Sequence, residues 1–242
     1  MAIEEKARID RASLVEISIP FVEPFQISGG VSHSRKSIIV ELESDGVTGY
    51  GESPPFEAPF YSSETTSSAK ALLTEWLLPR VVDREVQSIA SLNELIGRGI
   101  KGNNFARSGL ETAYWDLVAK KNGIHLRDLI LHKLRELGTP EESLANEDYI
   151  TSGVSIGIPV DEDEAVFTRW VERSLEEGYR RVKIKIRPGW DLLPSRLARD
   201  IIGYDFPFWV DANASYDLEQ HVSTLKELHG FRCLFLEQPL GH

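Results

Sequence analysis

The stretch RVKIKI, residues 181–186, decides the fold, because it alternates charged and branched apolar side chains as a β-strand does. Two further strand-like stretches follow along the chain, FWVDAN at 208–213 and LFLE at 234–237. The segments between them, about 190–202 and 218–228, have helical periodicity. Strands that alternate with helices in this way predict parallel strands joined by right-handed crossovers.

The same alternation extends back to residue 151. Residues 153–158 read as a strand, and residues 161–177 read as a helix with an acidic first turn. Residues 151–242 are therefore predicted to form one domain with about three βα units and a fourth strand.

The first half of the chain has a different pattern, which predicts an α+β domain over residues 1–134. A long stretch with glycine and serine, residues 20–36, is expected to be a loop between two strands. Polar residues 135–150 are interpreted as the linker between the two domains. The expected strands are 13–19, 37–43 and 47–51, with a turn at 44–46, and the expected helices are 63–82 and 104–121.

The charge balance argues against two classes of partner. Lys and Arg total 27 against 38 Asp and Glu, which gives a formal net charge of −11. Such a surface repels nucleic acid and anionic membranes, so neither is expected as a partner, and no stretch approaches the ~20 apolar residues of a membrane span. A small anionic substrate remains compatible, because a metal ion and a few lysines can reverse the local field.

The chain has a single cysteine, Cys233, so it can form no internal disulfide, and a reducing cytoplasm is the expected location. Cys233 lies in an apolar run. It is expected to be a small buried apolar residue rather than a nucleophile.

Three charged residues recur at one interval along the apolar strands. Asp211 follows Lys185 by 26 residues, and Glu237 follows Asp211 by 26 residues. Equal spacing by one βα unit places all three at the same end of neighbouring parallel strands, and in a βα-barrel this end carries the active site.

These residue types suit one kind of chemistry. Carboxylates on adjacent strands, Asp211 and Glu237, can hold a hard divalent cation such as Mg²⁺. A buried lysine beside them, Lys185, can act as a base, and the cation stabilises the negative charge that develops when a proton leaves carbon. Strand alternation puts Lys183 on the same face, where it could hold a substrate carboxylate.

Each of these residues also has an ordinary structural explanation. The lysines of the 181–186 strand could form a solvated face, Asp211 could cap or turn the chain, and Glu237 could be a plain strand end. Their common spacing and strand position favour a functional site.

The motifs resemble those of the enolase superfamily, in its muconate-lactonising subgroup. The segment VKIKIRPGWD at 182–191 is similar to the Lys-x-Lys motif, and DANASY at 211–216 and LEQPL at 236–240 are similar to the first two metal-ligand strands. Further similarity covers the substrate-covering loop at 20–37, the second capping loop at 51–54 and 61–66, and the capping-domain helix at 111–120. The resemblance implies an N-terminal α+β capping domain followed by an enolase-type TIM βα-barrel.

Within the superfamily these motifs are most similar to those of o-succinylbenzoate synthases and N-succinylamino acid racemases. The resemblance implies that Lys185 is the acid/base, that Lys183 binds the substrate carboxylate, and that Asn213 makes a polar contact near the metal. It also implies that Asp211 and Glu237 ligate Mg²⁺, with Mn²⁺ as an alternative. The expected partner is a small carboxylate substrate, and homo-oligomerisation is left open.

A complete (β/α)₈ barrel needs on the order of 250 residues, so the barrel is expected to be incomplete in this chain. The third metal ligand and the lysine of the opposite face are expected beyond His242. We expect a truncated product, part of a longer polypeptide or a chain completed by another, and negligible activity from a polypeptide that ends at His242.

Several functions stay open on the sequence. The best expectation is the synthase, a Mg²⁺-dependent dehydration through an enolate in menaquinone biosynthesis. N-succinylamino or N-acylamino acid racemase, muconate cycloisomerase and dipeptide epimerase are alternatives. A barrel aldolase with Lys185 as a Schiff base, or an inactive truncated paralogue that only binds, would be a different class.

Overall fold

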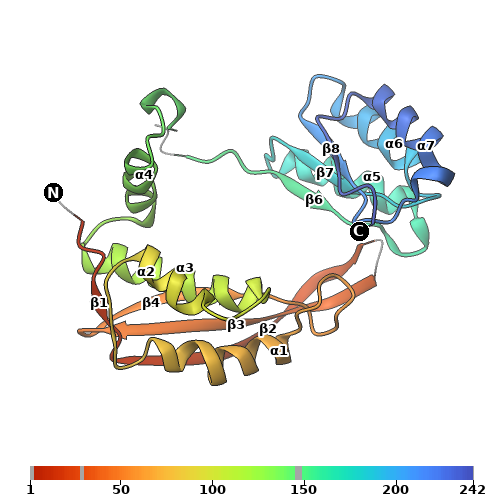
Figure 1. The fold of residues 1–242 in the computed structure, drawn as a ribbon. Helices are drawn as coiled ribbons and strands as arrows, with labels where there is room; N and C mark the ends of the chain where they lie inside the picture. The colour runs from red at the N-terminus through yellow and green to blue at the C-terminus, as the bar shows by residue number, and fades with distance from the viewer. Residues whose placement is uncertain (1–2, 28–29, 145–148, 242) are drawn as a thin grey trace. The chain divides into compact units, whose positions relative to one another are not determined.

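The computed structural model describes residues 3–27, 30–144 and 149–241 (Figure 1). The chain divides into two compact units. The first comprises Met1–Pro20 and Ser34–Asn146, and the second comprises Phe21–His33 and Glu147–His242. Within the described ranges, every helix is too short or too polar to cross a bilayer.

A three-stranded sheet makes up much of the first unit, and the ends of its first two strands, within Phe21–His33, belong to the second unit. Its order is β2 (Arg11–Ile27), β3 (Gly30–Ser44) and β4 (Val47–Ser53). Asp45 and Gly46 join β3 to β4, and both have positive φ, as a two-residue hairpin turn of type I′ requires. The turn expected at 44–46 is therefore confirmed.

The expectation of a loop over residues 20–36 is wrong for the described part of that stretch. β2 and β3 continue through it on either side of residues 28 and 29, which lie outside the described residues. Pairing between the two arms supplies the backbone hydrogen bonds, and the glycine- and serine-containing sequence does not reveal this pairing.

Helices complete the described part of the first unit, together with a short antiparallel pair, β1 (Ala7–Arg8) and β5 (Glu85–Val86). The helix expected over 63–82 begins at Thr66 and changes to π and then 3₁₀ winding after Leu72, whereas the helix expected over 104–121 is confirmed. No helix expected from the sequence corresponds to α2 or α4. The α-helices are α1 (Thr66–Leu72), α2 (Ile89–Gly97), α3 (Asn104–Lys121) and α4 (Leu126–Glu136).

Helix α3 lies directly on strand β4, and glycine permits this close approach. A Cβ added to Gly51 would lie 2.1 Å from the carbonyl oxygen of Gly109, and one added to Gly49 would lie 2.3 Å from that of Ala113. The helix therefore packs against the strand backbone itself. This contact fixes α3 over the buried face of the sheet.

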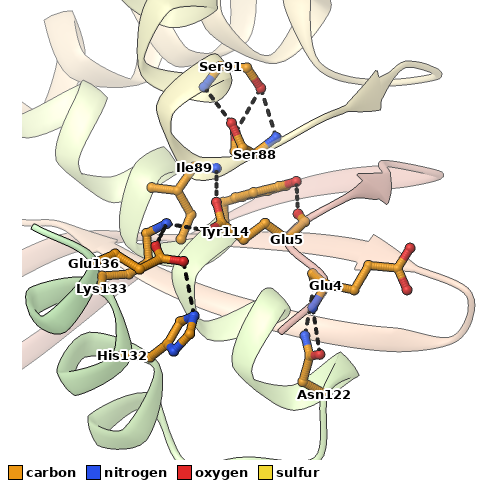
Figure 2. Close-up of polar contacts among 10 residues, drawn as sticks. All are labelled: Glu4, Glu5, Ser88, Ile89, Ser91, Tyr114, Asn122, His132, Lys133 and Glu136. Carbon is orange, nitrogen blue, oxygen red and sulfur yellow. Dashed lines mark hydrogen bonds and ion pairs between the residues drawn. The ribbon is translucent and has the colours of Figure 1, made fainter. Parts of the chain in front are cut away.

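The N-terminal segment is bound to the helices through Glu5 (Figure 2). The Glu5 carboxylate accepts a hydrogen bond from Ile89 N at the start of α2 and pairs with Lys133 of α4, at 3.0 and 2.5 Å. Lys133 also contacts Glu136, and the hydroxyl of Tyr114 on α3 donates to the Glu5 carbonyl at 2.6 Å. One residue thus connects three helices.

The second unit contains a parallel sheet of β6 (Val154–Ile156), β7 (Val182–Lys185), β8 (Phe208–Asp211) and β9 (Leu236–Glu237), in chain order. Helices α5 (Glu164–Glu176), α6 (Leu192–Ile202) and α7 (Leu218–Glu227) connect the strands (Figure 1). The βα repeat expected over 151–242 is confirmed. Short 3₁₀ turns occur at Glu141–Ser143, Val160–Glu162 and Leu228–Phe231.

The two faces of this sheet have opposite character. One face packs against the helices and forms a core with Phe167, Val171, Ala198 and Leu228; its strand residues are Val182, Ile184, Ile186, Phe208, Val210 and Ala212. Because strand side chains alternate, the intervening residues share the other face. These are Lys183, Lys185, Trp209, Asp211, Phe235 and Glu237. The charged residues of the sheet therefore lie together on the face away from the helices.

Candidate functional site

Strand register sets Lys185, Asp211 and Glu237 in one row. Lys185 pairs with Asp211 across β7 and β8, and Asp211 pairs with Glu237 across β8 and β9. Each is the last residue of its strand. The structure thus brings together the three residues that the 26-residue spacing placed at the same end of the sheet.

Lys185 is the most enclosed lysine of the site, with 7% of its surface exposed. Its Nζ donates to Asp211 Oδ2 at 2.6 Å and to Asn213 Oδ1 at 2.9 Å. Burial lowers the pKa of Lys185 below its ordinary value, although the hydrogen bond and charge of Asp211 oppose this change. The amine is therefore held in place and gives up its proton more readily than a lysine in water.

Asp211 is 1% exposed and is surrounded by donors. Its Oδ1 accepts from Asn213 N at 3.0 Å, while Oδ2 accepts from both lysines. Burial raises the pKa of this carboxyl, but hydrogen bonding and charge from Lys185 outweigh burial, so the pKa of Asp211 lies below its ordinary value. Asp211 is thus kept ionised.

Lys183 bridges the two carboxylates. Its Nζ lies 3.1 Å from Asp211 Oδ2 and 3.2 Å from each oxygen of Glu237. Burial lowers the pKa of Lys183, but the hydrogen bonds and charges of Asp211 and Glu237 outweigh burial and raise it above its ordinary value. The side chain therefore stays a cation at neutral pH.

Two residues near the site were not found by the sequence analysis. Trp209 Nε1 donates to Glu237 Oε2 at 3.1 Å, and Gln238 Oε1 accepts from Asn213 Nδ2 at 3.4 Å. Strand alternation could have found Trp209, because it lies two residues before Asp211 and opposite Lys183 in the register. Nothing in the local pattern indicates Gln238, which has a left-handed backbone with φ of 41°.

The donor set fits a hard divalent cation. Asp211 and Glu237 offer carboxylate oxygens, and an ammonium group already lies against three of them. Mg²⁺ prefers oxygen ligands and is commonly held by one or two carboxylates with water and substrate completing its shell. Among residues 3–27, 30–144 and 149–241 there is no cluster of three His, Cys, Asp or Glu side chains that could hold a metal.

Cys233 is half-buried, and its Sγ lies 3.8 Å from the carbonyl oxygen of Leu228. Burial raises the pKa of the Cys233 thiol to about 11, although Arg199 opposes this change. A thiol of this kind is a poor nucleophile at neutral pH.

Comparison with known families matches both parts of the chain. The profile for the mandelate racemase / muconate lactonizing enzyme N-terminal domain matches residues 11–130. The profile described as enolase C-terminal domain-like matches residues 166–242.

Individual relatives agree with these matches. The chain is 35% identical to o-succinylbenzoate synthase of Bacillus subtilis (strain 168), over 96% of this chain and 58% of that protein. It is 34% identical to N-succinylamino acid racemase of Thermus thermophilus, over 97% of this chain and 59% of the relative. The chain thus spans less than two thirds of the length of these curated relatives.

Solved structures show the same fold. A member of the enolase superfamily from Listeria innocua Clip11262 superposes with a TM-score of 0.83 at 31% identity, covering 97% of this chain and 59% of that one. The muconate lactonizing enzyme of Pseudomonas fluorescens superposes at 0.84, covering 97% and 61%, and its 20% identity shows the fold alone. With both domain profiles matched in order and the Lys, Asp and Glu residues in one row at the strand ends, the chain belongs to the mandelate racemase / muconate lactonizing enzyme family of the enolase superfamily.

Proposed function

We propose that the protein removes the proton α to the carboxylate of a small substrate in a Mg²⁺-dependent reaction that passes through an enolate. One observation carries this proposal: a buried lysine with a lowered pKa, Lys185, lies 2.6 Å from a carboxylate that points from the end of the next strand. A lysine base for a carbon acid needs a pKa below its ordinary value and a fixed position, and burial lowers the pKa of Lys185 while its hydrogen bonds fix the amine.

Each residue of the site has a role in this proposal. Lys185 takes the α-proton on its neutral Nζ, and Asn213 keeps that amine oriented through its amide oxygen. Asp211 and Glu237 hold the cation, which supplies charge stabilisation for the enolate when bound. Lys183 binds the substrate carboxylate, and its raised pKa supports this role because it keeps the side chain positively charged.

Among the reactions that begin with this step, we favour the o-succinylbenzoate synthase reaction, in which loss of the proton is followed by loss of water. Support comes from the relatives named for it, which are 35% and 36% identical to this chain. The second candidate is N-succinylamino acid racemisation, in which a proton returns to the other face of the same carbon, because a relative of that name is 34% identical. Muconate cycloisomerase and dipeptide epimerase are less well supported alternatives. We also propose that the enzyme works in the cytoplasm.

The complete protein should be assayed with the succinylbenzoate precursor and with N-succinylamino acids, with and without EDTA. We expect water loss from the precursor, and we expect EDTA to abolish it. Racemisation without dehydration would replace the first candidate with the second. Turnover that survives EDTA would contradict the metal-dependent proposal.

A Schiff-base aldolase would use Lys185 differently. It would form a covalent adduct with a carbonyl substrate, and borohydride would trap that adduct as a mass increase on the peptide that contains Lys185. We expect no such adduct, because Lys185 is hydrogen bonded to Asp211 and Asn213 as a proton carrier.

A further inference from the structure

We propose that Lys183 is the resident counter-cation of the metal site: its ammonium group holds Asp211 and Glu237 together until a divalent ion displaces it. The inference rests on the proposed function, since that function assigns the two carboxylates as metal ligands. It adds an exchange between a protein cation and the bound ion.

The contacts single out Lys183 from its neighbours. Its Nζ reaches three carboxylate oxygens, Asp211 Oδ2 at 3.1 Å and both oxygens of Glu237 at 3.2 Å. An ammonium group has three N–H donors, so the three acceptors satisfy it completely. By contrast, Lys185 donates to Asp211 and Asn213, and Trp209 donates to Glu237.

A positive charge is needed between the carboxylates of Asp211 and Glu237. Asp211 and Glu237 are direct cross-strand neighbours, and like charges in that position repel each other. Asp211 is 1% exposed, so water does little to relieve the repulsion on its side. The Lys183 ammonium therefore stabilises the arrangement of carboxylates that a divalent ion would use.

The ammonium group and a divalent ion cannot share this place. Mg²⁺ binds oxygen at about 2.0–2.1 Å, roughly 1 Å closer than the Lys183 Nζ lies to these same oxygens. An ion that draws the carboxylates to that distance leaves no room for the Nζ between them. The Lys183 side chain is 20% exposed, so the described residues do not enclose it completely and it can move away from the carboxylates.

After displacement by the ion, Lys183 would take on a second role. Once released from Asp211 and Glu237, the ammonium group lies beside the ion with its three donors free, and a substrate carboxylate can accept from them. Metal loading would thus prepare the site for an anionic substrate. Lys183 would therefore face the two metal ligands before the ion binds and the substrate carboxylate afterwards.

The exchange predicts that a substitution at Lys183 strengthens metal binding instead of weakening it. The complete protein would be titrated with Mn²⁺ while electron paramagnetic resonance measures the free ion, for wild type, Lys183→Met, Lys185→Met and Asp211→Asn. We expect Lys183→Met to bind Mn²⁺ about tenfold more tightly than wild type, because no protein cation then competes for the carboxylates. Lys185→Met removes the same charge without removing the bridge, so its gain should be smaller.

The outcomes separate the two proposals. If wild type binds Mn²⁺, Asp211→Asn does not, and Lys183→Met binds no more tightly than wild type or than Lys185→Met, the counter-cation is wrong and the metal site stands. If neither wild type nor Lys183→Met binds Mn²⁺, the metal site fails and the counter-cation fails with it.

A second measurement needs no variant, in case Lys183→Met does not fold. Acetic anhydride labelling of the wild-type chain, read by peptide mass spectrometry, should modify Lys183 faster when Mg²⁺ is added, because the amine leaves its two carboxylates. Lys120, which pairs with Asp116 on α3, serves as the control and should not change. Labelling of Lys183 that stays constant or slows with Mg²⁺ would overturn the proposal.

Discussion

Asp211 is the carboxylate that both lysines of the site contact. It is almost fully buried, and two lysines donate to the same oxygen. Removal of one partner from a buried ion pair leaves an uncompensated charge, which costs more than the pair itself gains.

We therefore expect Asp211→Asn to lower the free energy of unfolding by about 3 kcal/mol, the cost typical of breaking a buried pair. Urea unfolding followed by tryptophan fluorescence would measure it. The matched control is Asp217→Asn, because Asp217 is exposed and asparagine caps a helix as well as aspartate does. Equal losses for both variants would contradict the ion-pair account.

The same carboxylate predicts a pH dependence. The pKa of Asp211 is lower in the folded chain, where the lysines outweigh burial, than in the unfolded chain, where it is about 3.9. Its contribution to stability is therefore complete above about pH 4 and is lost as the pH falls through the folded pKa. The free energies of unfolding of wild type and Asp211→Asn should approach each other as the pH falls from about 4 through the folded pKa of Asp211. A difference that stays constant over this range would contradict this sign.

Cys233 gives a prediction that is independent of the site. Because burial raises the pKa of its thiol to about 11, the native chain should react slowly with iodoacetamide near neutral pH, and the rate should rise with a midpoint near that value. Urea-unfolded chain is the control and should react with an ordinary thiol midpoint. Rapid labelling of the native chain at neutral pH would contradict the expected inert thiol.

At the scale of elements, the contact between α3 and β4 shows how closely a helix can approach a strand where glycine leaves no side chain between them. Gly51 lies so close to α3 that an added Cβ would be 2.1 Å from Gly109 O and 2.4 Å from Ala113 N. Both are backbone atoms of a helix, so neither can move aside alone.

Gly51→Ala should lower the free energy of unfolding by about 3 kcal/mol, at the upper end of overpacking costs. Gly230→Ala is the control, because a Cβ there meets no atom within 4 Å, and its effect should stay within about 0.5 kcal/mol. Thermal unfolding followed by circular dichroism would compare them. A Gly51→Ala chain as stable as wild type would mean that α3 does not lie this close to the strand.

Elements also show how far the sequence predicts the fold. The repetition of strand-like and helical segments, with Val182–Lys185 and Phe208–Asp211 among the strands, was sufficient to predict parallel strands, because a helical crossover brings successive strands into the same direction. The arms on either side of residues 28 and 29 were interpreted as a loop, since their pairing is between segments and leaves little local pattern. α4 was missed because much of its surface is polar and only Leu129 is buried.

The candidate site was predictable in its residues but not in its contacts. Spacing and alternation identified Lys183, Lys185, Asp211 and Glu237. The bridging position of the Lys183 amine depends on side-chain rotamers and on the Trp209 indole beside Glu237, which no sequence period encodes. Asn213 was expected near the metal, which stays a prediction, and the structure places its amide oxygen 2.9 Å from Lys185 Nζ.

At the scale of the whole molecule, the chain combines an antiparallel sheet with helices in one unit and a parallel βα repeat in the other. The N-terminal profile matches residues 11–130, which include Phe21–His33 of the second unit, and the C-terminal profile matches residues 166–242. Four parallel strands are described in the second unit, whereas a (β/α)₈ barrel has eight. The polar face that carries Lys185 is the face that a closed barrel would turn inward, where proton abstraction can be shielded from bulk water.

We propose that Lys185 removes a proton from carbon beside a metal held by Asp211 and Glu237. Proton nuclear magnetic resonance in D₂O would follow exchange of the substrate α-hydrogen for deuterium, with the complete protein and the substrate that it turns over, the succinylbenzoate precursor or an N-succinylamino acid. We predict exchange that requires Mg²⁺, stops on addition of EDTA and is abolished by Lys185→Met, while the folded state of that variant is retained. Exchange that continues at the wild-type rate in Lys185→Met would contradict the claim.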